Sequence, residues 1–289
     1  MATMPSNTAP SATRPGHLSR VVVGVGDPVR DASVLAWARD EVAARGGRLT
    51  ICRAGPPPPG GSTMDAVTLA DPVFARAVHD VRQRIGGERV DLWFDQGTPV
   101  DVLADASSDA DLVVVGPPRG RHSTALRAIG TARHPVVIVR PVPGGRDAPF
   151  AGHVVAAVAG HPVDDSVVDL AMRHAAIHHL PLAAVHVSAE TTGDLWFDED
   201  VLETHFRVEP EQLGLLARVV EPVRARYPRV PLRLCVLVGA PVPRLRDAAR
   251  GALLTVVGRR RHLITPFRRP VCDALARSTT GPLAVVPCG

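Results

Sequence analysis

An internal repeat constrains this chain more than any other feature. The stretch 20–38 (RVVVGVGDPVRDASVLAWA) aligns with 153–171 (HVVAAVAGHPVDDSVVDLA) at an offset of 133 residues. Each copy reads as an apolar strand, a turn rich in Gly or Pro, and an Asp-containing start of a helix with apolar periodicity. A recurrence at this distance predicts two units of the same fold in one chain.

Later blocks recur in the same order. GTPVDVLADA at 97–106 aligns with GAPVPRLRDA at 239–248, and DLVVVG at 111–116 aligns with LLTVVG at 253–258. The ends of the two units repeat as well, as HPVVIV and GPLAVV. Because the blocks keep their order, we expect both units to alternate strands and helices in the same way.

The expected strands are continuous runs of Val, Leu and Ile, which is typical of parallel sheets covered on both faces. We therefore predict an α/β fold made of two tandem doubly wound five-stranded parallel sheets. The expected strands are 21–26, 49–53, 90–95, 112–116, 136–140, 153–158, 182–187, 232–237, 253–257 and 283–287. The expected helices are 31–45, 70–86, 99–107, 123–131, 164–179, 208–226, 241–250 and 268–279.

The expected domain organisation follows from the repeat. It comprises a disordered tail (1–18), a first domain (19–142), a linker (143–151) and a second domain (152–289). An acidic segment at 191–206, which carries Trp196 and Phe197, has no counterpart in the first unit. We interpret it as a solvated insertion with two buried anchors; a lid that binds a partner is the alternative.

Composition excludes several classes of protein. All 33 basic residues are Arg, so a lysine Schiff base and a Walker-type phosphate lysine are excluded. The net charge of +4 and the 3% aromatic content do not favour nucleic-acid binding. No apolar run is long enough to span a membrane. The four cysteines form no CxxC pair, which indicates reduced thiols and a cytoplasmic protein.

These segments resemble the universal stress protein family, as a tandem two-domain (adenine-nucleotide alpha-hydrolase-like) member. The resemblance rests on VVVGV, GTPVDVLADASSDADLVVVG and HPVVIVRP in the first half and on their repeats in the second. It implies that the last strands, 136–139 and 283–286, pair with each other as an internal pseudo-dimer. It also implies an ATP site at the carboxyl ends of the strands.

The resemblance places candidate nucleotide-binding residues in the first domain. The family's Asp at the end of the first strand aligns with Gly26, and Asp27 follows it. The loop after the fourth strand is shortened and contains Pro117 and Pro118, which lack an N–H donor. The candidate set for ATP or another adenine nucleotide is Gly24, Asp27, Gly97, Gly116, Gly120 and Ser123.

Other parts of the pattern depart from the family. In the second half Ala159 stands at the Asp position and only Gly258 of the loop glycines survives, so we expect no ATP there. Gly130 and Thr131 are predicted to end a helix, with Gly as its cap. Arginines near the two clefts favour either an anion site or a solvated basic loop. They are Arg119, Arg121, Arg127, Arg259, Arg260, Arg261, Arg268 and Arg269.

Two further patterns have structural interpretations. His174 and His178 have the i, i+4 spacing of a metal pair, but the sequence shows no nearby third ligand, so we expect an exposed polar helix face. Ser33 and Ser166 follow Asp31, Asp164 and Asp165 at the starts of helices, where N-capping or first-turn stabilisation explains all of them.

The sequence supports two hypotheses of function. One is a non-catalytic regulatory protein that needs no cofactor and acts by contact with an unidentified protein partner. The other is a sensor that binds ATP, another adenine nucleotide or another anion in the first-half cleft. A slow ATPase is a third idea, but no residue stands out as a base or a metal ligand. Whether two tandem chains pair further as a homodimer stays open.

Overall fold

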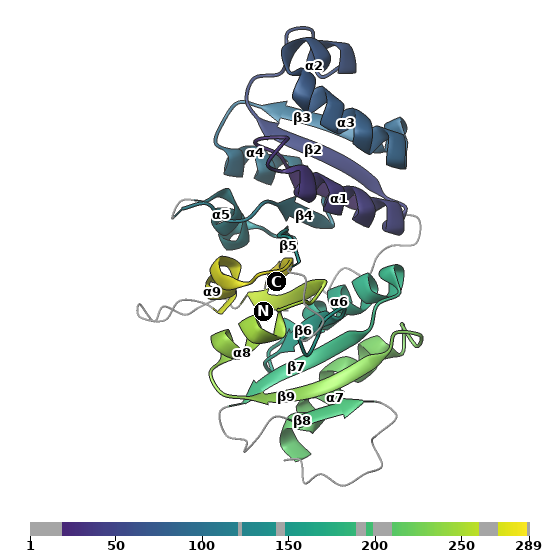
Figure 1. Ribbon diagram of the computed structural model, residues 1–289, viewed down its shortest axis with the longest axis vertical. Coiled ribbons are helices and arrows are strands. Elements are labelled where there is room, and N and C mark those ends of the chain that lie inside the picture. Colours follow the sequence, from purple (N-terminus) through teal and green to yellow (C-terminus); the bar gives the residue numbers. More distant parts are fainter. Residues whose placement is uncertain are drawn as a thin grey trace, which may run out of the picture.

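The computed structural model describes residues 19–120, 123–142, 148–188, 195–198, 210–259 and 271–287. They form one sheet of eleven strands in the order β3-β2-β1-β4-β5-β11-β10-β6-β7-β9-β8 (Figure 1). The expected tail 1–18 and most of the acidic insertion lie outside these ranges.

The first half contributes five parallel strands. They are β1 (Arg20–Gly24), β2 (Arg48–Ala54), β3 (Val90–Asp95), β4 (Leu112–Val115) and β5 (Val136–Ile138). Its helices are α1 (Ala32–Arg45), α2 (Met64–Ala70), α3 (Pro72–Ile85), α4 (Pro99–Ala106) and α5 (Thr124–Thr131), with a short 3-10 turn at Gly87–Arg89. The single helix expected over 70–86 is wrong at its start. Asp71 ends α2, and its carboxylate accepts a hydrogen bond from Phe74 N at 2.9 Å to begin α3.

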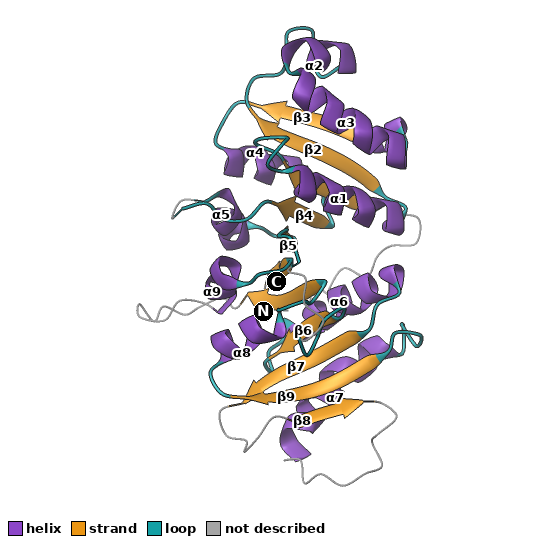
Figure 2. Cartoon of the chain, in the orientation of Figure 1, coloured by secondary structure: helices purple, strands orange, loops and turns teal. Residues whose placement is uncertain are grey.

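The second half repeats this arrangement. Its strands are β6 (Val154–Val158), β7 (Leu182–Ser188), β8 (Leu195–Asp198), β9 (Leu232–Val238), β10 (Leu254–Arg259) and β11 (Leu283–Pro287). Its helices are α6 (Asp164–His178), α7 (Pro210–Arg224), α8 (Pro241–Ala248) and α9 (Val271–Ser278). Five of the strands are parallel, as expected. The sixth, β8, comes from the acidic insertion and pairs antiparallel with β9 at the outer edge (Figure 2).

The two halves join through their last strands. β5 and β11 pair antiparallel, with Ile138 opposite Leu283 and Val136 opposite Val285. This confirms the internal pairing that the sequence led us to expect. Phe150, which falls in the expected linker, is fully buried in a hydrophobic cluster that contains residues of both halves. The two five-stranded sheets are therefore one continuous sheet.

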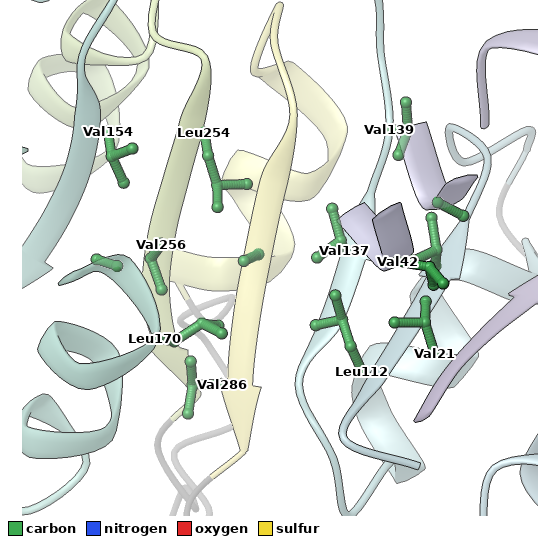
Figure 3. Packing of buried hydrophobic residues seen from close by; sticks show 14 of the residues in the cluster. Val21, Val42, Leu112, Val137, Val139, Val154, Leu170, Leu254, Val256 and Val286 are labelled. Atoms are coloured by element: carbon green, nitrogen blue, oxygen red, sulfur yellow. The ribbon is translucent and has the colours of Figure 1, made fainter. Parts of the chain in front are cut away.

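The core lies on both faces of this sheet and runs through both halves. One face is covered by α1, α3, α6 and α7, and the other by α4, α5, α8 and α9. Figure 3 shows residues of the first layer, where Val21, Val137, Val256 and Val286 come from four strands of the two halves. Burial of both faces explains why the strands are continuous apolar runs rather than alternating ones.

Candidate functional site

The crevice at the carboxyl ends of β1 and β4 is the expected ligand site of such a sheet. In the first half an aspartate of the chain itself lies there. Asp31 Oδ2 accepts hydrogen bonds from Gly26 N at 2.9 Å and from Asp27 N at 3.1 Å. Its Oδ1 atom lies so close to Gly116 that a Cβ on that glycine would stand 3.3 Å away. The Asp31 carboxylate thus bridges the ends of the two strands.

Asp27, the predicted substitute for the family's Asp, serves its own turn instead. Its Oδ1 atom accepts hydrogen bonds from Val29 N at 3.0 Å and Arg30 N at 3.1 Å. The hydrogen bond from the Arg30 backbone, joined by that from Val29, lowers the pKa of the Asp27 carboxyl below its ordinary value. The Asp27 carboxylate therefore closes the turn between β1 and α1, and both backbone N–H groups that donate to it belong to that turn.

The glycines of the candidate set divide into two groups. Gly24 ends β1 and Gly116 follows β4, so these two lie on neighbouring strands at the crevice. Gly97 follows β3, which β2 separates from β1, and its φ of 147° serves the turn into α4. Gly120, with φ at 76°, has nothing within 4 Å of an added Cβ. Ser123 precedes α5 and is buried, but its side chain makes no capping hydrogen bond.

The second crevice repeats the aspartate more tightly. Asp164, which is Asp31 shifted by the repeat offset, is 2% exposed. Its Oδ2 atom accepts three backbone hydrogen bonds, from Ala159 N at 2.9 Å, Gly160 N at 2.6 Å and His161 N at 2.8 Å. We expected N-capping or first-turn stabilisation from these aspartates. Asp31 does stand at the N-cap of α1, and Asp164 and Asp165 lie in the first turn of α6, but neither Asp31 nor Asp164 caps its helix with the side chain. Both side chains accept from the turn before the helix.

Apolar side chains also fill the second crevice. A Cβ on Gly258 would lie 2.5 Å from Val163 Cγ1, and a Cβ on Gly160 would lie 3.0 Å from Leu215 Cδ1. Val163 is 7% exposed, whereas Arg30 at the equivalent position of the first half has a side chain that is 68% exposed. In addition, Gln212 on α7 donates a hydrogen bond to Ser188 at the end of β7. Among the described residues, apolar contacts as well as hydrogen bonds to a carboxylate therefore surround the turn after β6.

The arginines that the sequence analysis grouped around the clefts have different roles. Arg259 donates to the carbonyls of Gly130 and Ala132 and so binds the C-terminus of α5 in the other half. That helix ends at Thr131, as expected, but its cap residue is Ala132 rather than Gly130. Arg119 Nη2 lies 3.9 Å from Asp31 Oδ1. Arg121, Arg260, Arg261, Arg268 and Arg269 fall outside the described residues.

Arg140 forms a matching bond in the opposite direction. It follows β5 and donates to Thr279 Oγ1 at 3.1 Å and to the Ala276 carbonyl, at the C-terminus of α9. Burial lowers the pKa of its guanidinium below the usual value. Cations are favourable at helix C-termini, where carbonyls are left without partners. Each half thus provides an arginine for a helix end of the other.

The predicted exposed histidine face is wrong. His174 is 5% exposed and stacks on Trp37 of α1, with ring centroids 5.9 Å apart. His174 and His178 both approach Glu41, which α1 contributes from the first half and which is 1% exposed. Sequence reasoning missed Glu41 because it lies more than 130 residues away. A charged residue at an apolar position of the α1 pattern was the available signal.

A cavity of about 330 Å³ lies elsewhere, between α4 and α5. It is lined by residues that include Val100, Leu103, Ala128, Thr131 and His134. Ser108 and His134, which precede β4 and β5, place it at the amino ends of these strands, opposite the crevice. No member of the predicted nucleotide set lines this cavity.

The fold is thus a tandem α/β sheet in which each half has parallel strands. Known proteins were compared with it at the level of sequence and of fold. Residues 17–140 match the model described as Universal stress protein family. A universal stress protein of Mycobacterium tuberculosis is 31% identical over 172 residues, which cover 56% of this chain and 53% of that protein. The chain therefore spans about half the length of the curated relatives that it matches.

Solved structures agree on the fold of the whole chain. A universal stress protein from Archaeoglobus fulgidus aligns with 93% of this chain and 96% of its own, with a TM-score of 0.60 and 14% identity. A universal stress protein solved in complex with cAMP aligns with 42% of this chain, at 23% identity and a TM-score of 0.34. The bound cAMP is a finding about that protein. Residues 17–140 are thus similar to the universal stress protein family, and the chain has the tandem two-domain fold of such a protein.

None of the helices in the described ranges has both the length and the hydropathy of a membrane-spanning helix.

Proposed function

We propose that this chain is a non-catalytic universal stress protein whose two crevices are closed to nucleotides and which acts through protein contacts. One observation carries the proposal. The carboxylates of Asp31 and Asp164 accept the backbone N–H groups of the turns that follow β1 and β6. Phosphates bind at such places through free N–H donors, and a carboxylate both uses these donors and repels an anion.

The exposed apolar side chains support protein contact. Leu69 is 88% exposed, Val73 is 52% exposed and Trp93 is 38% exposed. They belong to α2, α3 and β3, which form the outer end of the first half (Figure 1). At the opposite end of the sheet β8 covers β9, whereas β3 has no further strand beside it in the described sheet. An uncovered edge with exposed apolar residues is a common docking feature.

Isothermal titration with Mg²⁺-ATP, AMP and cAMP tests the closed crevices. We expect no saturable heat from the unmodified chain up to about 1 mM, which corresponds to a binding free energy weaker than about −4 kcal/mol. Asp31→Ala should bind ATP more tightly than the unmodified chain, because it frees two N–H groups and removes a charge. Asp164→Ala is the matched control and should not, because Val163 and Leu215 still fill that crevice. Saturable one-site binding by the unmodified chain would contradict the proposal.

An adenine-nucleotide sensor is the second candidate, and the openness of the first crevice favours it. An added Cβ at Gly120 meets nothing within 4 Å, and the Arg30 side chain, which pairs with Asp27 Oδ2 at 3.4 Å, is 68% exposed. If this candidate holds, the unmodified chain binds one nucleotide and Gly120→Trp abolishes that binding. Protein contact is tested separately by capture from a lysate. Trp93→Arg combined with Leu69→Glu should reduce capture, while Val29→Glu, at an exposed site in the β1–α1 turn, should not.

A further inference from the structure

Three potential metal ligands from the two halves converge at the contact between α1 and α6. His178 Nε2 lies 2.8 Å from Glu41 Oε2, and His174 Nδ1 lies 3.0 Å from the same oxygen. The three ligand atoms lie within 4.8 Å of one another. Glu41 and His174 are almost completely buried, whereas the His178 side chain is 26% exposed. The cluster is therefore enclosed on the protein side and has an approach from solvent through His178.

The hydrogen bonds around His174 leave a ring nitrogen without a partner. Although Nδ1 of His174 is close to Glu41 Oε2, it makes no hydrogen bond of acceptable geometry, and it is buried. A buried polar atom without a partner is costly in a folded protein. This one lies 3.0 Å from Glu41 Oε2, the oxygen that His178 Nε2 also approaches.

The two oxygens of the Glu41 carboxylate have different neighbours. Arg45 contacts Oε1 at 2.6 Å and leaves Oε2 for the histidines. Neutral imidazoles and a carboxylate are preferred ligands of Zn²⁺.

We propose that Glu41, His174 and His178 form a binding site for a divalent transition-metal ion, of which Zn²⁺ is the best match, and that this ion fastens the first half to the second. Two nitrogens and one oxygen leave a fourth tetrahedral position that water can fill from the side of His178. Metal bonds of about 2.0–2.1 Å place tetrahedral ligand atoms about 3.3 Å apart, so each histidine nitrogen needs to move only slightly away from Glu41 Oε2. Arg45 weakens the carboxylate as a ligand, so we expect micromolar affinity.

The test is a titration of ZnCl₂ into the full chain after treatment with a chelator, followed by calorimetry. We expect one Zn²⁺ per chain and an affinity that falls by at least about 100-fold in His178→Ala and in Glu41→Gln. His79→Ala changes an exposed histidine of α3 and is the matched control, which should bind as the unmodified chain does. Co²⁺ in place of Zn²⁺ should give the visible absorption of a tetrahedral nitrogen–oxygen site, and His178→Ala should lose it.

Thermal unfolding with and without Zn²⁺ tests the fastening role and checks that the variants fold. Binding to the folded state alone raises Tm, and this rise should disappear in His178→Ala while its cooperative unfolding in chelator persists. His178→Gln, which keeps the polar contact to Glu41, provides a second variant if the alanine variant unfolds. Zn²⁺ affinity that is the same in the unmodified chain, His178→Gln and Glu41→Gln would overturn the site. Binding that leaves Tm unchanged would overturn the fastening role.

Discussion

The turns after the first strand of each half share a sequence pattern but are packed to different degrees. In the first half Asp31 accepts two backbone hydrogen bonds, and the Arg30 side chain is 68% exposed. In the second half Asp164 accepts three, and Val163 packs against Gly258. We propose that the shared aspartate takes the place of an external anion at the turn. The added valine shows how packing then removes the remaining space.

Removing the two aspartates should give the largest difference between the halves. Asp164→Ala leaves three backbone N–H groups without their acceptor, and we expect a loss of about 3 kcal/mol in the free energy of unfolding. Asp31→Ala leaves only two such N–H groups and should cost about half as much. Urea unfolding followed by circular dichroism measures both. Equal losses in the free energy of unfolding would mean that the two carboxylates stabilise their turns equally, which would contradict the proposed difference between the halves.

The glycines that follow the fourth strand of each half test the packing difference. Gly258→Ala places a Cβ against Val163, a stiff β-branched side chain, and should destabilise by about 2 kcal/mol through overpacking. Gly116→Ala meets the end of the Asp31 carboxylate at 3.3 Å and should cost less than about 1 kcal/mol. The same urea titration applies. A larger loss for Gly116→Ala would show that the first crevice is the tighter one.

The reciprocal arginines should differ by a smaller amount. Arg140→Met removes partly buried hydrogen bonds to the end of α9, and we expect a loss of about 1.5 kcal/mol. Arg259→Met removes a more exposed pair of bonds to the end of α5 and should cost about 0.5 kcal/mol. Thermal unfolding by calorimetry compares them directly. The prediction fails if Arg259→Met shifts Tm by more than Arg140→Met does.

The smallest effect concerns pH and only the first half, because Gly160 stands where the first half has Asp27. The Arg30 and Val29 amides lower the pKa of folded Asp27. Its stabilising contribution is therefore present above the pKa of the unfolded chain and is lost as the pH falls through the lower folded value. Asp27→Asn should flatten this part of the stability curve in urea unfolding between pH 5 and about 2. An unchanged curve would show that the Asp27 carboxylate does not contribute to stability in this pH range.

The regular elements followed directly from the sequence. Runs such as Leu112–Val115 are too apolar for anything but a strand buried on both faces, and the repeat allowed each half to check the other. The break between α2 and α3 was missed, although Asp71 and Pro72, a capping residue and a first-turn proline, were the signal for it. β8 was missed because four residues from an insertion gain their strand structure only by pairing with β9.

The site was only partly predictable. The glycines Gly24 and Gly116 do meet at the crevice, because the order of strands in this fold brings their ends together. The direction of a side chain depends on hydrogen bonds within its turn, so the sequence could not show that Asp27 accepts from Val29 and Arg30 while Asp31 accepts from Gly26 and Asp27. Asp31 and Asp164 stand at the same position of the repeat, and this coincidence was the signal for their shared role. Glu41 needed the contact between α1 and α6.

We propose that the carboxylates of Asp31 and Asp164 hold the N–H groups that a nucleotide would need. The most direct measurement follows the backbone amide resonances of Gly26, Asp27, Ala159, Gly160 and His161 by NMR during titration with Mg²⁺-ATP. We predict that all five resonances keep their positions up to millimolar nucleotide. In Asp31→Ala, added nucleotide should shift only the resonances of Gly26 and Asp27. A saturable shift of Gly26 and Asp27 in the unmodified chain would contradict it.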